Sequence, residues 1–206
     1  MASTLRTPVS AVLLAAGAGT RLGRGPKALL PAGGIPLVQK MAAVLADGGC
    51  TDVCVVLGAE AARVRQAADL SGCTVLENPD WAAGMGGSFR LGVNAAPAGH
   101  AVLVALVDQP GVTAPLVRRL IAAHQPGRVT AAGYRAPGGA LRRGHPVLFA
   151  PGPAAAAARQ ASGDAGARDF LAAHPGLVDV VDCSDLSDGG DIDTPADLFR
   201  LGGYQG

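Results

Sequence analysis

The chain has 206 residues, of which 49% are hydrophobic and 16% charged, and its formal net charge at pH 7 is +1. This length and composition suit a single compact domain, residues 1–206, with one well-filled core. Because no basic tract or basic amphipathic helix accompanies the near-neutral charge, we expect a small-molecule partner, no nucleic acid and no membrane.

The N-terminal stretch Met1–Ser10 is short and polar, and no run approaches the about 18 apolar residues that a membrane span needs. We therefore expect a cytoplasmic protein. The 4 cysteines and 4 histidines are dispersed and show no paired spacing typical of a zinc or redox site. We expect reduced core thiols and no transition-metal site.

The first predicted element is an apolar strand over Ala11–Ala16 that breaks into a glycine-rich turn at 17–19. Arg21 and Lys27 follow within one short loop. Glycines let backbone N–H groups approach a ligand closely, and the two cations add positive charge. This pattern predicts a loop that holds the phosphates of a nucleoside triphosphate.

Two common phosphate-binding loops do not fit this segment. A P-loop needs a hydroxyl residue after its lysine, but Lys27 precedes Ala28. The dinucleotide fingerprint needs its third glycine three residues after the second, whereas Gly23 comes four residues after Gly19. A plain tight turn remains the structural alternative.

Apolar runs of strand length then alternate with helical patterns along the chain, which predicts an α/β fold with parallel strands and crossover helices. Most runs are too apolar for a wet face, so we expect a sheet covered on both sides, with ligands at the carboxyl edge of its strands. The further strand candidates are Asp52–Leu57, Thr74–Glu77, Ala101–Val107, Val129–Tyr134, Pro146–Phe149 and Val178–Asp182.

Helices are predicted between these strands. An apolar stripe at 37–45 ends at Gly48, which is typical of a helix followed by a glycine. Thr113 is expected to cap a second helix. Thr194, followed by Pro195 and Asp197, has the pattern of a third helix start. The segment Pro137–Gly144 is predicted to be a loop.

A glycine-rich segment, Asn78–Ser88, lies between a strand and a helix. In the functional interpretation, Gly84 and Met85 offer backbone groups to a nucleobase. In the structural interpretation, Ser88 or Asn78 caps the helix and Trp81 is a packing residue.

Carboxylates occur in two separate segments that we expect to lie at the same edge of the sheet. Asp108 comes directly after a buried strand, where it could also cap a helix, and Asp191 and Asp193 precede the last predicted helix. Carboxylates that face a triphosphate held by Lys27 and Arg21 form an oxygen-only site suited to Mg²⁺. Attack by an anionic phosphate on the α-phosphorus needs positioning and charge neutralisation, which agrees with the lack of a Ser/His/Asp arrangement in the sequence.

Two later segments combine glycine with polar groups. His145 precedes Pro146, and Asp164 and Arg168 lie in a second glycine-rich stretch. His145 and Arg168 would suit an anionic acceptor. Alternatively, His145 begins a strand and Asp164 caps a helix.

Taken together, these segments resemble the MobA-like nucleotidyltransferases, and most closely their molybdenum cofactor cytidylyltransferase branch. The matching blocks are LLAAGAGTRLGRGPK, NPDWAAGMGGS, VDQP, GHPVLF, GDAGAR and DIDTPADL, in this order over nearly the whole chain. The resemblance implies a three-layer Rossmann-like nucleotidyltransferase fold with a mostly parallel sheet. It also implies transfer of a nucleoside monophosphate, with release of pyrophosphate, to a phosphorylated acceptor such as molybdopterin.

The resemblance also implies site roles. Arg21, Lys27 and Asp108 would be catalytic, Asp108 and Asp193 would hold Mg²⁺, and Asp191 is a weaker candidate for the metal. The acceptor would meet His145, Asp164 and Arg168. The Ala15-Ala16-Gly17 sequence is similar to the cytidylyl branch and favours CTP over GTP. The nucleotide-binding set is Ala15, Ala16, Gly17, Gly19, Arg21, Lys27, Asn78, Gly84, Met85 and Ser88.

Three alternatives stay open. A guanylyltransferase of the same family would use the same site with GTP. An NAD(P)-dependent oxidoreductase of small heterocycles would need an acidic residue after the second strand, where Glu60 lies. A binding protein with this fold and no turnover is the third.

Overall fold

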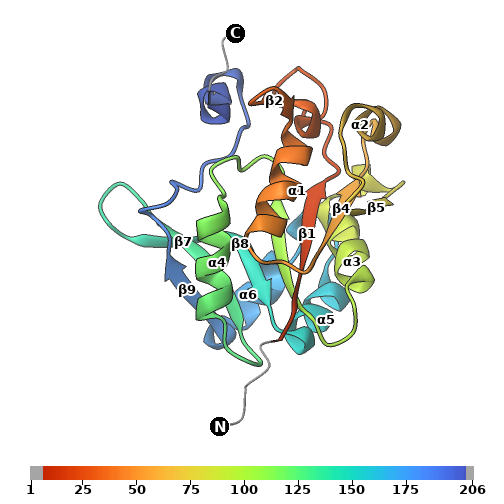
Figure 1. The fold of residues 1–206 in the computed structure, drawn as a ribbon. Coiled ribbons are helices and arrows are strands. Elements are labelled where there is room, and N and C mark those ends of the chain that lie inside the picture. Colours follow the sequence, from red (N-terminus) through yellow and green to blue (C-terminus); the bar gives the residue numbers. More distant parts are fainter. Residues whose placement is uncertain (1–6, 203–206) are drawn as a thin grey trace.

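A seven-stranded sheet forms the centre of the protein in the computed structural model, which describes residues 7–202 (Figure 1). Residues 1–6, within the polar N-terminal stretch, lie outside this range. The strand order is β5-β4-β1-β6-β8-β7-β9. The strands are β1 (Val9–Ala15), β4 (Asp52–Leu57), β5 (Thr74–Glu77), β6 (Ala101–Leu106), β7 (Val129–Arg135), β8 (Leu141–Phe149) and β9 (Val178–Asp182).

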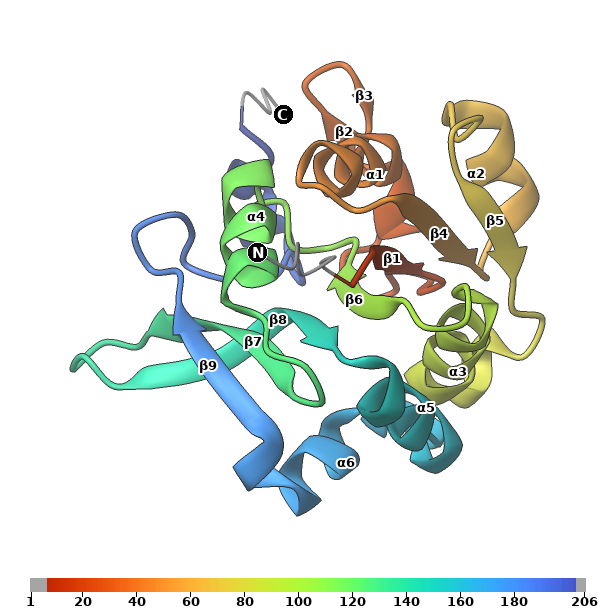
Figure 2. The same cartoon turned by 60° about the horizontal axis from the view of Figure 1, so that its bottom comes forward.

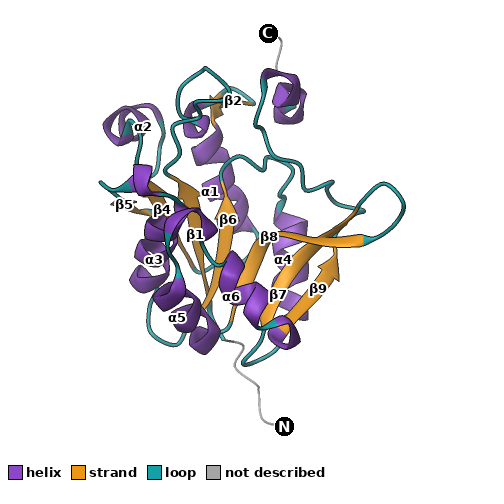
Figure 3. Cartoon of the chain, turned by 180° about the vertical axis from the view of Figure 1, so that it is seen from behind, coloured by secondary structure: helices purple, strands orange, loops and turns teal. Residues whose placement is uncertain are grey.

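Helices cover both faces of the sheet, which confirms the predicted α/β fold in three layers. Helices α1 and α4 pack on one face, and α3, α5 and α6 lie on the other (Figures 1 and 3). A small hairpin of β2 (Pro31–Ala32) and β3 (Ile35–Pro36) precedes α1. The helices are α1 (Leu37–Asp47), α2 (Ala61–Ala67), α3 (Met85–Ala95), α4 (Ala114–Ala123), α5 (Pro151–Gln160) and α6 (Arg168–Ala173).

The central strands are mostly apolar because both of their faces are covered. Every residue of β1 is buried, and β1 pairs in parallel with β4 and with β6. One layer of core lies between the sheet and α1 and α4, and a second lies under α3, α5 and α6. The second layer contains an edge-to-face pair of Phe89 and Phe149, whose ring centroids are 5.9 Å apart.

One strand prediction was wrong in its length and direction. The segment predicted as the loop Pro137–Gly144 supplies the first residues of β8, which is antiparallel to both β6 and β7. Figure 2 shows the resulting β7–β8 hairpin extending past the rest of the sheet. Gly144 misled the prediction because it serves a close approach: a Cβ there would lie 2.8 Å from Cε2 of Tyr134.

Helix caps were predicted with mixed success. The last helical segment, the 3₁₀ helix Pro195–Leu201, has the expected start, with a reciprocal capping box between Thr194 and Asp197. Thr113 precedes α4 but its side chain makes no capping hydrogen bond. The capping role considered for Asp164 is wrong, because α6 begins at Arg168 without a side-chain cap.

The described residues also bear on the membrane and metal expectations. Within residues 7–202, no helix has the length and apolar character needed to cross a bilayer. In the same range, no cluster of three or more His, Cys, Asp or Glu side chains could hold a metal ion. All four cysteines are free thiols; Cys73 is half-buried, and the other three are buried.

Candidate functional site

A cavity of about 450 Å³, here called the main cavity, lies at the carboxyl edge of β1 and β6. This is the edge at which open α/β sheets bind ligands. Most of the predicted site residues line it, although they come from five separate segments. They are Ala16, Gly17, Gly19, Arg21, Lys27, Gly84, Met85, Ser88, Asp108, Asp164 and Asp193.

The glycine loop after β1 folds tightly back on itself. Gly19 has a φ of 64°, and a Cβ at this position would lie only 2.2 Å from the carbonyl oxygen of Gly25. A side chain at residue 19 is therefore excluded by the backbone on the other side of the loop. The close contact brings the 3₁₀ helix Lys27–Leu29 next to the end of β1.

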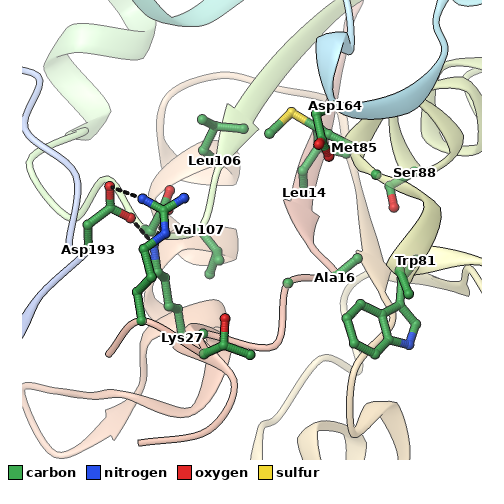
Figure 4. Close-up of a pocket in the computed structure, with 17 residues that line it drawn as sticks. Leu14, Ala16, Lys27, Trp81, Met85, Ser88, Leu106, Val107, Asp164 and Asp193 are labelled. Atoms are coloured by element: carbon green, nitrogen blue, oxygen red, sulfur yellow. Dashed lines mark hydrogen bonds and ion pairs between the residues drawn. The ribbon is translucent and has the colours of Figure 1, made fainter. Parts of the chain in front are cut away.

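Three charged side chains meet at one end of the main cavity. The Nζ atom of Lys27 donates hydrogen bonds to Oδ2 of Asp108 at 2.8 Å and to Oδ1 of Asp193 at 2.6 Å. Figure 4 shows Lys27 and Asp193 joined at this end. We call Lys27, Asp108 and Asp193 the carboxyl-edge cluster. Arg21 extends it, with its Nη1 atom 3.7 Å from Oδ2 of Asp193.

Backbone contacts explain why two aspartates 85 positions apart in the chain come together. The N–H group of Ile192 donates to the carbonyl oxygen of Asp108 at 2.9 Å. The Ile192 side chain is fully buried and anchors this segment in the core. Asp193, the next residue, is thereby held beside the end of β6.

Lys27 and Asp193 stay charged at neutral pH. Partial burial lowers the pKa of Lys27, but hydrogen bonds to Asp108 and Asp193 outweigh burial and raise the pKa above its ordinary value. The hydrogen bond from Lys27 lowers the pKa of Asp193. Lys27 is thus an ammonium that neutralises two carboxylates, with its side chain only 15% exposed.

Asp191 is oriented differently from Asp193. Its Oδ1 atom accepts a hydrogen bond of 2.7 Å from Nε2 of Gln109, and it does not line the main cavity. Desolvation raises the pKa of Asp191, and the nearby carboxylates of Asp108 and Asp193 add to the increase. The structure therefore separates the two aspartates, in agreement with the weaker standing of Asp191 in the sequence analysis.

The opposite end of the main cavity comes largely from the Asn78–Ser88 segment, and Asp164 lies there beside Met85 (Figure 4). Nδ2 of Asn78 donates to Oγ of Ser88 at 3.0 Å, and both residues are buried. The capping role considered for them is wrong, because α3 begins after Gly84 without a side-chain cap. Asn78 supports Ser88 from behind and does not line the cavity, and Ala15 is likewise buried within β1.

A second cavity of about 210 Å³ adjoins the main cavity, and Leu14 and Met85 line both. Its walls include Arg143, His145 and Arg168, together with apolar side chains from β6, β8 and α6. Burial lowers the pKa of His145 to about 4, so its imidazole is neutral at pH 7. Of the predicted acceptor residues, His145 and Arg168 lie here, whereas Asp164 lines the main cavity.

Sequence reasoning missed several wall residues, above all Trp81 and Arg143. Trp81 lies in the segment already singled out but was considered only as a packing residue. Arg143 lay in the predicted loop, and only a correct β8 would have placed it beside His145. The apolar residues Leu106 and Val107 gave no signal, because the end of a buried strand looks the same in the core and at a cavity wall.

A Ser/His/Asp group does exist, contrary to the sequence analysis, but it lies at the opposite edge of the sheet. Oγ of Ser10 donates to Oδ2 of Asp52 at 2.9 Å and lies 2.8 Å from Nδ1 of His100. We call these three residues the amino-edge cluster. Ser10 is buried, and none of the three lines the main or the second cavity. This arrangement does not expose a nucleophile.

The acidic residue considered for an oxidoreductase does not face the main cavity. Glu60 precedes α2, and its Oε2 atom accepts a hydrogen bond of 2.8 Å from Nη1 of Arg63. A carboxylate that binds a cofactor ribose would have to line the cavity, and Glu60 does not.

Comparisons with known proteins agree with this geometry. Residues 11–178 match the MobA-like NTP transferase domain family. A nucleotidyl transferase from Methanothermobacter thermautotroptrophicus superimposes with a TM-score of 0.78 at 24% identity, covering 94% of this chain and 95% of that one. A Mycobacterium tuberculosis protein solved in complex with manganese gives a TM-score of 0.74 at 27% identity, covering 95% and 98%.

One curated relative is named for a different activity. The Nicotine blue oxidoreductase of Paenarthrobacter nicotinovorans is 50% identical over 195 residues, which are 94% of this chain and 96% of the relative. Its name describes a redox activity, whereas the family description and the Methanothermobacter structure describe nucleotidyl transfer.

Proposed function

Because this chain belongs to the MobA-like NTP transferase family, we propose that it transfers CMP from CTP to a phosphorylated acceptor of the molybdopterin type. The observation that carries the proposal is the carboxyl-edge cluster. It places Lys27 and two carboxylates beside a glycine loop at the ligand edge of the sheet. Pyrophosphate is the leaving group.

The carboxyl-edge cluster fits a magnesium ion by the chemistry of its donors. Mg²⁺ is usually held by one or two carboxylates, with substrate phosphates and water completing its octahedral shell. Asp108 and Asp193 supply two oxygen donors, both within 2.8 Å of the same Lys27 nitrogen. When bound, the ion would neutralise charge on the triphosphate. The manganese complex of a structural relative supports a divalent ion in this fold.

Lys27 and Arg21 are assigned to the triphosphate. Lys27 remains protonated, and its short bonds to the carboxylates can be exchanged for bonds to phosphate oxygens. At about 4 Å and an effective dielectric of about 20, a pair of unit charges interacts by ~4 kcal/mol. Cations held in this position stabilise the charge that develops on the departing pyrophosphate.

Ser88 is assigned to the base. Its Oγ atom accepts a hydrogen bond from Asn78, so its own proton is free to be donated into the main cavity. The Watson–Crick edge of cytosine presents acceptors at O2 and N3 and a donor at N4, while guanine presents an acceptor at O6 and donors at N1 and N2. A hydroxyl at this wall can donate to either base, so the preference for CTP rests on the similarity of Ala15-Ala16-Gly17 to the cytidylyl branch. The backbone of Gly84 and Met85 lines the same end.

The acceptor is assigned to the second cavity and the adjoining wall at Asp164. Arg168 supplies a guanidinium for an anionic group, and the apolar walls suit the ring system of a pterin. His145 is neutral, so it acts as a hydrogen-bonding group and not as a cation. Because a phosphate nucleophile is already anionic, its attack on the α-phosphorus requires alignment and no general base.

A second candidate function rests on the relative named Nicotine blue oxidoreductase, which is 50% identical to this chain. In this case the apolar second cavity would hold the heterocyclic pigment, and the glycine loop would hold the phosphates of NAD(P)H. The orientation of Glu60 toward Arg63 argues against the ribose contact that this requires. A guanylyltransferase and a binding protein without turnover are the remaining alternatives.

One assay separates these functions. Purified protein with Mg²⁺ and a molybdopterin-containing extract is given each nucleoside triphosphate, and pyrophosphate release is followed. In parallel, NADPH oxidation is followed with nicotine blue as the electron acceptor. The proposal predicts pyrophosphate release with CTP and no NADPH oxidation. NADPH oxidation without consumption of any triphosphate would overturn it in favour of the oxidoreductase.

A further inference from the structure

The two ends of the main cavity differ in chemistry as the two ends of a nucleotide do. Lys27 and Asp193 lie at one end, and Trp81 and Ala16 lie at the other (Figure 4). If the end that carries Lys27 holds phosphates, as in the proposed function on which this inference rests, the base must lie toward Trp81. The proposed function itself assigns no role to Trp81.

Trp81 is the one tryptophan of the chain and is only half-buried. It begins the 3₁₀ helix Trp81–Ala83, which separates β5 from α3. Among residues 7–202, its indole N–H group has no hydrogen-bonding partner. A large aromatic side chain left at a cavity wall, with its polar atom unpaired, is suited to a ligand rather than to the core.

The position of Trp81 is fixed by the backbone around it. A Cβ at Gly58 would lie 2.5 Å from Cβ of Trp81 and 2.8 Å from the carbonyl oxygen of Ala16. Only glycine at 58 lets the indole pack against the ends of β1 and β4. The preceding turn is also held, because the N–H group of Asp80 donates to Oδ1 of Asn78 at 3.1 Å.

We propose that the indole of Trp81 is the surface on which the nucleobase packs, and that it supplies affinity for the base beyond that provided by the triphosphate. Stacking of a base on an aromatic side chain does not depend on the donor and acceptor pattern of the base. Trp81 therefore strengthens binding of any nucleoside triphosphate, and the choice between bases is left to hydrogen-bonding groups.

The test measures binding and not turnover. Isothermal titration with Mg²⁺ present compares CTP with inorganic tripolyphosphate, which has charge but no base. Trp81→Leu removes the ring, and Trp81→Phe keeps a smaller one. Phe199→Leu is the matched control, because Phe199 is an aromatic residue that is 71% exposed and does not line the main cavity. Thermal unfolding verifies that each variant is folded.

The expected result is a loss of CTP affinity of about tenfold or more in Trp81→Leu and a smaller loss in Trp81→Phe. Tripolyphosphate affinity should stay unchanged in both, and Phe199→Leu should match the wild type. Binding of CTP should also change the intrinsic fluorescence of the wild type, since Trp81 is its one indole.

Two results would overturn the inference while the proposed function stands. One is unchanged CTP affinity in Trp81→Leu. The other is an equal loss of CTP and tripolyphosphate affinity, which indicates damage to the cavity as a whole. If the wild type binds tripolyphosphate but no nucleoside triphosphate, the base has no site and both proposals fail.

Discussion

The sheet carries a polar cluster at each of its two edges, and each cluster contains aspartate. At the amino edge, Ser10, Asp52 and His100 satisfy one another around a buried hydroxyl. At the carboxyl edge, Lys27 bridges Asp108 and Asp193 on the wall of a cavity of about 450 Å³. The clusters also differ in their surroundings: the carboxyl-edge cluster lines the main cavity, whereas the amino-edge cluster lines neither the main nor the second cavity.

This difference has a topological origin. At the carboxyl edge, the chain leaves parallel strands through long loops before it enters the crossover helices, and those loops enclose the main cavity. At the amino edge, the cluster sits at or just before the starts of β1, β4 and β6, whose paired registers bring the residues together. The general tendency of α/β sheets to bind ligands at the carboxyl ends of their strands thus favours the carboxyl-edge cluster as the functional one.

The largest expected effect is on turnover, and it contrasts an aspartate from each edge. Asp108→Asn should lower the rate of pyrophosphate release at least about a thousandfold, because it removes a negatively charged donor for the metal at the reacting phosphates. Asp52→Asn should leave the rate within about twofold of the wild type. Steady-state kinetics with CTP measures both, and similar losses in the two variants would erase the distinction between the edges.

The next effect concerns stability and the wall of the second cavity. Burial lowers the pKa of His145 to about 4, while Asp108 raises it and Arg143 lowers it further. The unfolded chain therefore binds one more proton than the folded protein between about pH 6.5 and 4, and stability falls as the pH decreases through that window. The expected contribution is roughly 3 kcal/mol.

Urea denaturation at pH 7.5, 6 and 5 checks this dependence. In His145→Gln, which cannot titrate, the fall in unfolding free energy over this range should be smaller. Parallel curves for the wild type and the variant would show that the imidazole of His145 is accessible to protons in the folded protein.

A smaller effect is expected on metal binding without nucleotide. Lys27→Met removes the ammonium that holds both carboxylates at 2.8 and 2.6 Å, so Mn²⁺ should bind about tenfold more tightly. Electron paramagnetic resonance of free Mn²⁺ measures the affinity. The control variant Lys40→Met removes the same charge from α1. It therefore measures the effect of net charge alone and should change the Mn²⁺ affinity little. Unchanged or weaker Mn²⁺ binding in Lys27→Met would show that the cation site lies elsewhere.

The smallest effect is expected at the amino edge. Ser10→Ala removes the hydroxyl that links Asp52 and His100 and should lower the free energy of unfolding by about 1–2 kcal/mol. The turnover rate should not change. Chemical denaturation and the pyrophosphate assay measure the two quantities, and a loss of turnover without a loss of stability would assign the amino-edge cluster a functional role.

The sequence predicted the parts of the fold that depend on local patterns. The strands predicted over Asp52–Leu57 and Thr74–Glu77 agree with β4 and β5 to the residue. The start of β8 could not be predicted in this way. Its residues 142–145 are polar or glycine, and their strand geometry comes from pairing with β7, as in the pair Arg143 and Gly133.

The site was predictable to a similar extent. Glycines and charges beside strand ends pointed to Lys27, Asp108 and Asp193, and the structure brings these three together. The different orientations of Asp191 and Asp193 depend on Gln109, a contact that no spacing rule encodes. The position of Trp81 at the cavity wall and the neutral state of His145 both depend on burial, and only the assembled fold determines which side chains are buried.

The most direct test of the central claim follows the α-phosphorus of CTP. With Mg²⁺ and a molybdopterin-containing extract, label at the α-position should move to the acceptor, and the pyrophosphate released should carry none of it. Asp108→Asn should abolish the transfer. If the label stays in CTP under every combination of metal and acceptor, while the same protein reduces nicotine blue with NADPH, the carboxyl-edge cluster is not a nucleotidyl-transfer site.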